Sequence, residues 1–323
     1  MKNKTIVSSV LSVSIALLAT QNVNAEDNKG ANNEEWDKPI FIKGADLEGQ
    51  ELQETKDDLN VKDDFETYSV NVNDVSKYVP SSGNLSYIYS SATIEKKSFR
   101  SGVDVEIDTP DNITKVTSEQ YRNAAITAGI KNASIHIASV EPVTGEGALA
   151  GIYKAYEEKG NTLNSADVEN ADKEMQDLSQ ISEDNKDQEG YSDGALNNAV
   201  AEIKQEIAKQ KQNNNDLNES DVRSIVDDVL KEKGLNKVLS DNQVNTINNL
   251  MVNVAKSNAV NQDPKAFEKQ AKNLSKDTQK LANKAKDKLK DLNTEENRNL
   301  LQRVWDAIVG FIKWLINLIS SLF

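Results

Sequence analysis

The feature that most constrains the fold is a long stretch with almost no glycine, proline or aromatic residues. From position 195 to position 304 the chain has one glycine, Gly234, one proline, Pro264, and one of Phe, Trp or Tyr, Phe267. Turns use glycine and proline, and strands are rich in aromatic side chains. Their scarcity over so long a stretch favours helices.

Apolar residues in this stretch recur at the three- and four-residue spacing of amphipathic helices. A further set, Phe267, Leu274 and Leu281, recurs every seven residues among mostly polar neighbours. We therefore predict an extended all-α region over residues 161–298, whose last helix is long and bathed in solvent. The other sets are Leu196, Val200, Ile203 and Ile207; Val222, Ile225, Val226, Val229 and Leu230; and Val244, Ile247, Leu250, Met251 and Val254.

Residues 39–160 mix strand and helix patterns and predict an α+β domain, a small sheet with packed helices. Residues 102–109 alternate apolar with acidic side chains, as in a strand buried on one face. Thr117 and Gln120 have the spacing of a capping box at the start of a helix. The expected strands cover residues 39–44, 65–72, 84–97, 102–109 and 132–140, and the expected helices cover residues 46–59 and 117–129.

The chain begins with the three parts of a secretory signal peptide. Lys2 and Lys4 precede an apolar run, and a small-residue cleavage pattern ends at Ala25. The run is too short for a comfortable membrane span. We expect residues 1–25 to be removed, residues 26–38 to form a flexible leader, and the protein to be secreted, either extracellular or associated with the cell envelope.

Composition excludes cysteine chemistry and argues against binding to nucleic acid. The chain has no cysteine, so it has neither disulfides nor thiolate metal sites. Without Lys2 and Lys4, 36 basic residues (38 minus 2) stand against 52 acidic ones, a net charge of about −16. Nucleic-acid binding selects for clustered Lys and Arg, so this balance excludes nucleic acid as a partner.

Residues 299–323 have the pattern of an amphipathic helix with a narrow polar stripe. Polar or small residues follow one another three or four positions apart, and most others are apolar. A transmembrane span would place Lys313 near the bilayer centre, at a cost of about 2.5–3.5 kcal/mol. We favour contact with a membrane surface, with a protein partner, with the helical region or with a second copy of the chain. The expected contact residues are Trp305, Ile308, Phe311, Ile312, Trp314, Leu315, Leu318, Ile319, Leu322 and Phe323.

The only histidine, His136, alternates with Ile135 and Ile137 and so lies on the opposite strand face. No Gly-x-Ser-x-Gly motif marks a nucleophile, which favours a structural or exposed histidine. With one histidine and no cysteine, a zinc site would need mostly carboxylates. We therefore expect neither a metal nor a cofactor.

Three acids, Asp104, Glu106 and Asp108, repeat every two residues and share one strand face. Such an arrangement can bind calcium or supply acid/base chemistry. It is also typical of the solvated face of a half-buried strand, which is the interpretation we favour.

The segment VTGEGALAG, residues 143–151, joins an expected strand to a helical pattern. Its spacing is G-x-G-x-x-x-G, whereas dinucleotide-binding loops have G-x-G-x-x-G, and no lysine follows the last glycine as in a P-loop. We interpret it as a tight helix–sheet junction in which Thr144 caps the helix and Glu146 lies in its first turn. The junction residues are Thr144, Gly145, Glu146, Gly147 and Gly151.

Three motifs carry a resemblance to a known family: TPDNIT at 109–114, YRNAAITAG at 121–129 and PVTGEGALAGIYKA at 142–155. Together with the order of signal, α/β region, helical region and amphipathic tail, they resemble secreted proteins of low-GC Gram-positive bacteria grouped as domain of unknown function 1002. The resemblance implies an extracellular or cell-envelope location. It brings no catalytic residues.

Two functions are consistent with these patterns. The first is a non-enzymatic binding or structural module, secreted or associated with the envelope, whose C-terminal helix contacts a membrane or a partner. The alternative is an envelope hydrolase or transferase that uses Glu141, Glu146 or the acids of residues 104–108 for acid/base catalysis. Acids that converge in a cleft favour the enzyme, and a convex acidic surface favours the binding module.

Overall fold

The computed structural model describes residues 38–83, 85–97, 102–213 and 217–292, with side chains described up to position 280. The expected signal peptide, residues 26–37 of the expected leader and the expected amphipathic helix over 299–323 lie outside these residues, as do all the expected tail contacts. None of the described helices is long and apolar enough to cross a membrane.

The first part of the chain forms a mixed five-stranded sheet. Its strands are β1 (Ile40–Gly44), β2 (Glu66–Val70), β3 (Ser91–Lys96), β4 (Val103–Ile107) and β5 (Ala133–Ala138). Their order is β2-β1-β3-β5-β4. The pairs β1–β2 and β4–β5 are parallel, and the central β3 is antiparallel to both of its neighbours. The sheet, followed by many helices, confirms the α+β prediction for this part.

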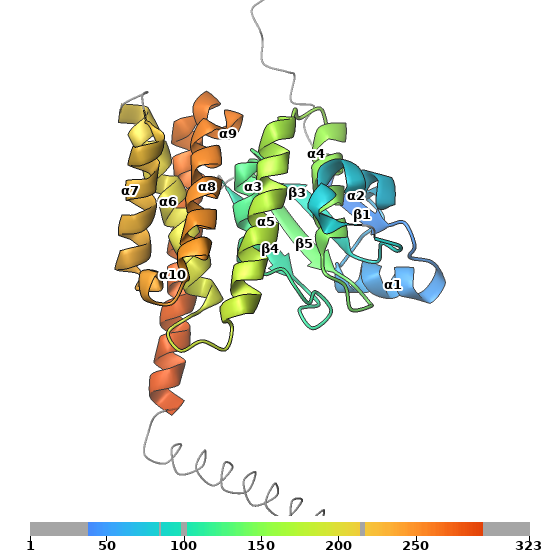
Figure 1. Ribbon diagram of the computed structural model, residues 1–323. Coiled ribbons are helices and arrows are strands. Elements are labelled where there is room, and N and C mark those ends of the chain that lie inside the picture. The colour runs from blue at the N-terminus through green and yellow to red at the C-terminus, as the bar shows by residue number, and fades with distance from the viewer. Residues whose placement is uncertain (1–37, 84, 98–101, 214–216, 293–323) are drawn as a thin grey trace, which may run out of the picture.

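Helices cover one face of the sheet. Here α3 (Ser118–Thr127) packs on β4, and α4 (Glu146–Glu158) packs on β1, β2 and β3 (Figure 1). Ile42, Ile94 and Ile135 point into this core, where they join the buried rings of Tyr121 and Tyr153. Helices α2 (Val72–Tyr78) and α5 (Ser165–Asn185) pack against α4 and α3, respectively.

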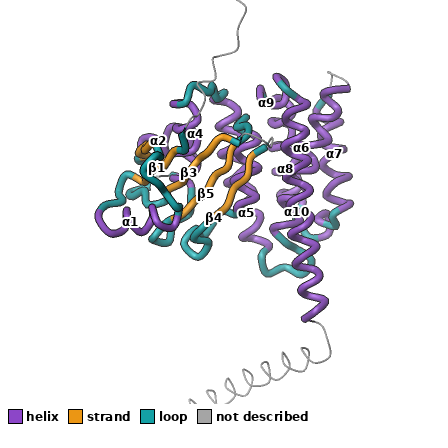
Figure 2. Tube along the Cα trace, turned by 180° about the vertical axis from the view of Figure 1, so that it is seen from behind, coloured by secondary structure: helices purple, strands orange, loops and turns teal. Residues whose placement is uncertain are grey.

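The other face of the sheet is covered only in part by the described elements. Helix α1 (Gly49–Asp58) lies on the β1 side, where Phe41, Leu52 and Leu59 form a small apolar core with Ala138. Figure 2 views the molecule from behind and shows β3, β5 and β4 facing the viewer. The described chain places no helix over β4 and β5 on this face. The polar side chains of these two strands are therefore not covered by a helix there.

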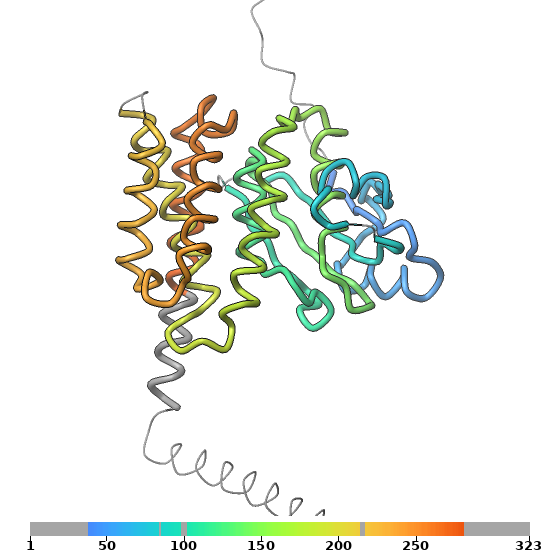
Figure 3. Tube along the Cα trace, in the orientation of Figure 1, coloured from blue at the N-terminus to red at the C-terminus, as the bar shows by residue number. Residues whose placement is uncertain are grey.

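The second part of the chain is a helical bundle. Its helices are α6 (Asp193–Asn213), α7 (Glu219–Glu232), α8 (Asp241–Lys256), α9 (Asn258–Gln262) and α10 (Pro264–Leu292). A short 3-10 turn, Leu235–Lys237, joins α7 to α8, and another, Pro80–Ser82, follows α2 in the sheet part. Ile126 of α3 and Leu178 and Ile181 of α5 belong to the core of this bundle. The bundle therefore stands directly beside the sheet part (Figure 3). The helices predicted after residue 160 are present in the described chain, but they do not form an extended region, since α3 and α5 offer an apolar surface on which the bundle packs.

Helix α10 is also less exposed than expected. Phe267 and Leu274 are buried against α6, and the amide of Asn198 donates to Ser275 O at 2.6 Å and to Thr278 Oγ1 at 2.9 Å. The prediction of a solvent-bathed helix is therefore wrong up to position 280. Its polar residues misled the prediction because they form buried hydrogen bonds with another helix.

One helix was not predicted at all. The chain turns from strand to helix at Asn71, although the alternating pattern continues to residue 72. Asn71 Oδ1 accepts from Asn73 N and Asp74 N, and Asp74 Oδ2 accepts from Asn71 N at 2.9 Å. This capping box starts α2 and ends the expected strand two residues early.

Candidate functional site

The candidate site lies on the polar half of the sheet, opposite the main core. Ile135 and Ile137 point into the core, so the alternation of β5 places His136 on the other face. The register pairs His136 with Thr93 of β3 and with Glu106 of β4. We call this surface the polar sheet face; its residues are Thr93, Glu95, Asp104, Glu106, Asp108, Ser134 and His136.

His136 and Asp108 form the central pair of this face. His136 Nδ1 lies 3.1 Å from Asp108 Oδ1 and 3.2 Å from Oδ2. Asp108 follows the last residue of β4, and its backbone N donates to Ile137 O at 2.8 Å, which fixes it beside β5. The two side chains are 39% and 19% exposed, so both remain open to a ligand.

Glu106 completes a cluster of three groups that can hold a metal. One donor atom each from Glu106, Asp108 and His136 lies within 4.8 Å of the others. The sequence analysis expected no metal site because there is a single histidine. Strand pairing supplies the two carboxylates that a one-histidine site needs.

Asp104, the third acid of the strand, is in a different environment. Its carboxylate forms ion pairs with Lys97 and with Arg122, whose Nη2 lies 3.5 Å from Asp104 Oδ1 and 3.2 Å from Asp277 Oδ2 of α10. Its charge is therefore compensated. Among the described residues, no Lys or Arg side chain pairs with Glu106 or Asp108 in the same way. The three acids thus do not act as one set.

A pocket of about 440 Å³ lies beside the His136–Asp108 pair. The sheet forms one wall, and the segment that follows α1 forms the other. Four carboxylates and one lysine line it, so the pocket carries net negative charge and attracts cations. Its lining residues are Pro39, Asp58, Leu59, Asn60, Lys62, Asp64, Phe65, Thr93, Glu95, Asp108 and His136.

This arrangement has two chemical capabilities. Imidazole and carboxylate donors can bind a divalent cation. An imidazole oriented by a carboxylate can also transfer protons to or from a bound molecule. The sequence analysis did not join Glu95 or residues 58–65 to His136, because only the strand order and the position of α1 bring them together. The one available signal was the shared alternation of polar positions in three separate strands.

The glycine-rich junction lies on the opposite face of the sheet, in the main core. The N-cap of α4 is Gly145 with φ 109°, and no side chain caps the helix. The expectation that Thr144 caps it is wrong, because the left-handed glycine separates Thr144 from the first turn. Glu146 begins the helix, is buried, and lies 3.5 Å from Lys115 Nζ. A buried carboxylate therefore stands in the first turn of α4, where it would repel a phosphate.

Two glycines of this junction lie close against the sheet. A Cβ on Gly151 would stand 2.3 Å from Ile42 Cγ2, and a Cβ on Gly147 would stand 2.8 Å from Ser90 Oγ. The phenol of Tyr121 donates to Gly145 O at 2.7 Å. Burial, and then the charge of Glu146, raise the pKa of Tyr121 well above its usual value. The segment thus serves close packing.

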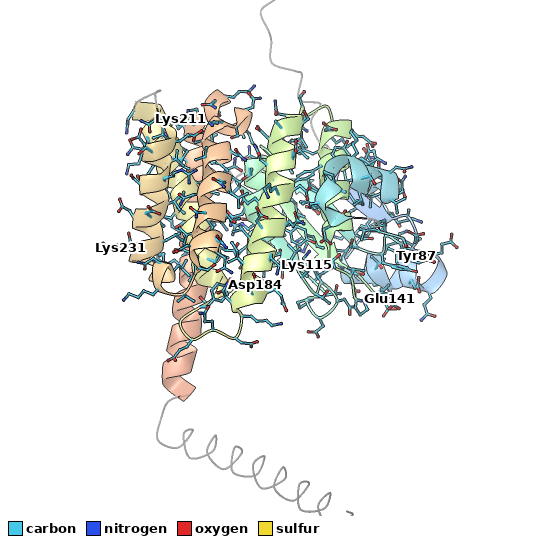
Figure 4. The ribbon with its side chains drawn as sticks, in the orientation of Figure 1. Tyr87, Lys115, Glu141, Asp184, Lys211 and Lys231 are labelled. Atoms are coloured by element: carbon cyan, nitrogen blue, oxygen red, sulfur yellow. The ribbon has the colours of Figure 1, made fainter. Side chains whose placement is uncertain are left out.

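The acids proposed for an enzyme do not converge on one site. Glu141 is exposed at the outer edge of the sheet part, on the side of Tyr87 (Figure 4). Glu146 belongs to the main core, and neither residue lines the pocket. Of the expected catalytic acids, only Glu106 and Asp108 lie together with the histidine.

A second polar cluster, which the sequence analysis missed, joins the sheet part to the bundle. Lys204 Nζ donates to Glu174 Oε1 at 2.5 Å and to Asn123 O at 2.9 Å, and Thr127 Oγ1 donates to Glu174 Oε2 at 2.6 Å. Burial lowers the pKa of Lys204, and the charge of Glu174 opposes that effect. A lysine within an apolar helical stripe was the only signal in the sequence.

The comparisons with known proteins agree with the resemblance in the motifs. The family model described as "Protein of unknown function (DUF1002)" matches residues 43–274. The chain is 32% identical over 292 residues to "Uncharacterized protein YpuA" of Bacillus subtilis (strain 168), which covers 85% of this chain and 89% of that relative. No solved structure matches the chain significantly. This chain therefore belongs to the DUF1002 family of proteins of unknown function.

Proposed function

We propose that this chain is a secreted, envelope-associated binding protein whose sheet pocket takes a positively charged ligand. The observation that carries the proposal is the pocket beside His136, with four carboxylates against one lysine. A concave surface lined mainly by one sign of charge concentrates ligands of the other sign. The negative net charge of the whole chain also favours a positively charged ligand, and it disfavours nucleic acid.

The C-terminal segment supplies the second half of the proposal. Its sequence combines a wide apolar face with a polar stripe, a pattern typical of helices that lie on a membrane surface. A partner protein, or a second copy of the chain, is the other surface that such a face covers.

The pocket is tested with spermidine, a small organic cation, added to the chain without residues 1–25 in a calorimetric titration. Asp64 lines the pocket, and its neighbour Asp63 does not. We expect Asp64→Asn to weaken binding severalfold and Asp63→Asn to leave it within about twofold, because only the first removes a pocket charge. Absence of binding would exclude a small organic cation as the ligand, and equal effects of the two variants would contradict the pocket assignment.

The tail is tested by sedimentation with vesicles of phosphatidylcholine, which carries no net charge. Leu315→Glu places a carboxylate on the apolar face, and Asn317→Glu places the same charge on the polar stripe. We expect the first variant to leave the vesicles and the second to stay bound. If both variants sediment like the unmodified chain, the membrane assignment fails; size-exclusion chromatography of the same variants then tests self-association.

A second function, an envelope hydrolase or transferase, is favoured by the 3.1 Å contact of His136 with Asp108 beside the pocket. Release of soluble fragments from purified cell walls is the corresponding assay. Fragments released by the unmodified chain and lost in His136→Gln would favour the enzyme over the binding protein.

A further inference from the structure

We infer that Glu106, Asp108 and His136 bind a divalent transition-metal ion, for which Zn²⁺ is the best match. This inference rests on the proposed function, since the ion is the positive charge that the pocket takes. It goes further because it assigns three ligands from two neighbouring strands and selects an inorganic cation over an organic one.

The spacing of the donor atoms fits such an ion. Zn–N and Zn–O bonds are about 2.0–2.1 Å, so two ligand atoms on a tetrahedral ion lie about 3.4 Å apart. His136 Nδ1 and Asp108 Oδ1 are 3.1 Å apart. Glu106 is within 4.8 Å of both and is exposed, so rotation of its side chain brings a carboxylate oxygen to the ion.

The charges around the cluster also favour a cation. Asp104 is two residues from Glu106 on the same strand face, and it is compensated by Lys97 and Arg122. Among the residues that the structure describes, neither Glu106 nor Asp108 forms an ion pair with a lysine or an arginine; the partner of Asp108 is His136, which is itself a proposed ligand. Lys97 and Arg122 neutralise the negative charge of Asp104. A divalent ion would neutralise the charges of Glu106 and Asp108 in the same way.

The donor set selects a transition metal over calcium. Calcium takes six to eight oxygen ligands, whereas one imidazole and two carboxylates are typical ligands of zinc. Three protein ligands leave the fourth position of a tetrahedral ion open. Two of the three ligands, His136 and Asp108, line the pocket, so a molecule bound there is near enough to complete the coordination.

The ligands stand on rigid elements, which lowers the cost of organising the site. Glu106 and His136 are directly paired in the β4–β5 register. The turn after Asp108 is held by Thr109 Oγ1, which accepts from Ser139 N at 2.9 Å. Because Glu106 is exposed and the His136 side chain is 39% exposed, ions can reach the site from solvent.

The test is a titration of ZnCl₂ into the EDTA-treated chain without residues 1–25, followed by calorimetry, with visible absorption of Co²⁺ as a second readout. We expect one ion per chain. Loss of groups that only orient a ligand costs about 10–100-fold in affinity, so His136→Gln and Glu106→Gln should each weaken binding at least tenfold. His136→Gln should also change the Co²⁺ spectrum, since it removes the nitrogen ligand.

Asp104→Asn is the matched control, because it makes the same change in charge on the same strand face outside the cluster. We expect it to bind Zn²⁺ within about threefold of the unmodified chain, because a nearby surface charge adds little at moderate salt. Circular dichroism verifies that each variant is folded. A millimolar concentration of Ca²⁺ should not displace the zinc.

Several results would overturn the inference: no binding of Zn²⁺ or Co²⁺, a His136→Gln variant that binds like the unmodified chain, an Asp104→Asn variant as weak as Glu106→Gln, or displacement by Ca²⁺. The spermidine titration separates the two proposals. If Asp64-dependent spermidine binding is present and Zn²⁺ does not bind, the metal assignment fails and the cationic pocket stands. If Zn²⁺ binds through His136 and spermidine does not bind, the organic-cation ligand fails.

Discussion

Lys204 Nζ of α6 lies 2.5 Å from Glu174 Oε1 of α5. The two side chains are 0% and 1% exposed, so both are fully buried. The pair sits between the core of the sheet part and the core of the bundle. Asn123 and Thr127 of α3 provide the remaining hydrogen bonds. One ionic cluster therefore links three helices across the junction of the two parts of the molecule.

Removal of one partner of this pair should destabilise the protein strongly. In Lys204→Met the carboxylate of Glu174 stays buried without its counter-ion, which costs about 3–5 kcal/mol in the free energy of unfolding. Urea unfolding followed by circular dichroism measures this loss. The double variant Lys204→Met with Glu174→Leu should recover a large part of it, since no unpaired charge is left.

An exposed ion pair of the same helix is the control. Lys209 lies 3.1 Å from Glu206, with side chains 54% and 31% exposed. Lys209→Met should change the free energy of unfolding by about 0–1 kcal/mol. Equal losses for Lys204→Met and Lys209→Met would show that the buried pair has no special role.

A second prediction concerns the pH dependence of stability at Asp172. Burial raises the pKa of this carboxyl above 3.8, Glu146 and Glu169 add to the shift, and the hydrogen bonds from Ser81 oppose it. Between 3.8 and the raised pKa the folded state therefore holds more protons than the unfolded state. The stability that Asp172 contributes is complete below 3.8 and is lost as pH rises through the raised pKa.

Asp172→Asn removes this titration. Urea midpoints are measured for both proteins from about pH 4 to about pH 7. As the pH rises, the midpoint of the variant should increase relative to that of the unmodified chain. Parallel pH profiles for the two proteins would show that the buried carboxyl does not titrate differently in the folded state.

A third prediction concerns the close contact of α4 with the sheet. The Cβ of Gly151→Ala would stand 2.3 Å from Ile42 Cγ2. Such overpacking typically costs about 1–3 kcal/mol, measured as the change in the free energy of unfolding. Gly194→Ala in α6 is the control, because nothing lies within 4 Å of its Cβ, and it should be neutral or stabilise by up to about 1 kcal/mol.

A fourth prediction compares two buried tyrosines. Tyr121→Phe removes the donor that Gly145 O accepts at 2.7 Å and should cost about 0.5–1.5 kcal/mol. The hydroxyl of Tyr153 is buried without a hydrogen-bond partner in the described structure. Tyr153→Phe should therefore leave the thermal midpoint unchanged or raise it. A larger loss for Tyr153→Phe than for Tyr121→Phe would contradict the two assignments.

Local features of the sequence were reliable predictors of individual elements. The Thr117–Gln120 capping box starts α3 as predicted, with Thr117 N donating to Gln120 Oε1 at 2.9 Å. Each of the five strands lies within an expected range, and alternation marked those at 65–72, 102–109 and 132–140, because one face of each packs on the main core. The range expected at 84–97 was too long, since β3 begins only at Ser91. The prediction at Asn71 was wrong because a cap formed by two side chains overrides a strand pattern.

The sequence identified residues of the candidate site but did not show that they lie together. The acids of residues 104–108 and His136 were each singled out, yet neither set implied the other. Asp104 and Asp108 looked equivalent by spacing, and only the positions of Lys97 and Arg122 separate them. The pocket depends on where the segment after α1 meets β3 and β5, which periodicity does not reveal.

By itself, the sequence determined the order of a strand-rich part and a helical part, the phase of the strands at 102–109 and 132–140, and the Thr117–Gln120 cap of α3, because these depend on neighbours within a few residues. Only the tertiary structure decided that Glu106 stands beside His136 and that Lys204 meets Glu174. These contacts join residues 30 positions apart, and they arise when separate apolar faces are buried together. When the apolar face of each helix or strand is buried, the packing decides which polar side chains meet on the opposite faces. Only the folded chain fixes that packing.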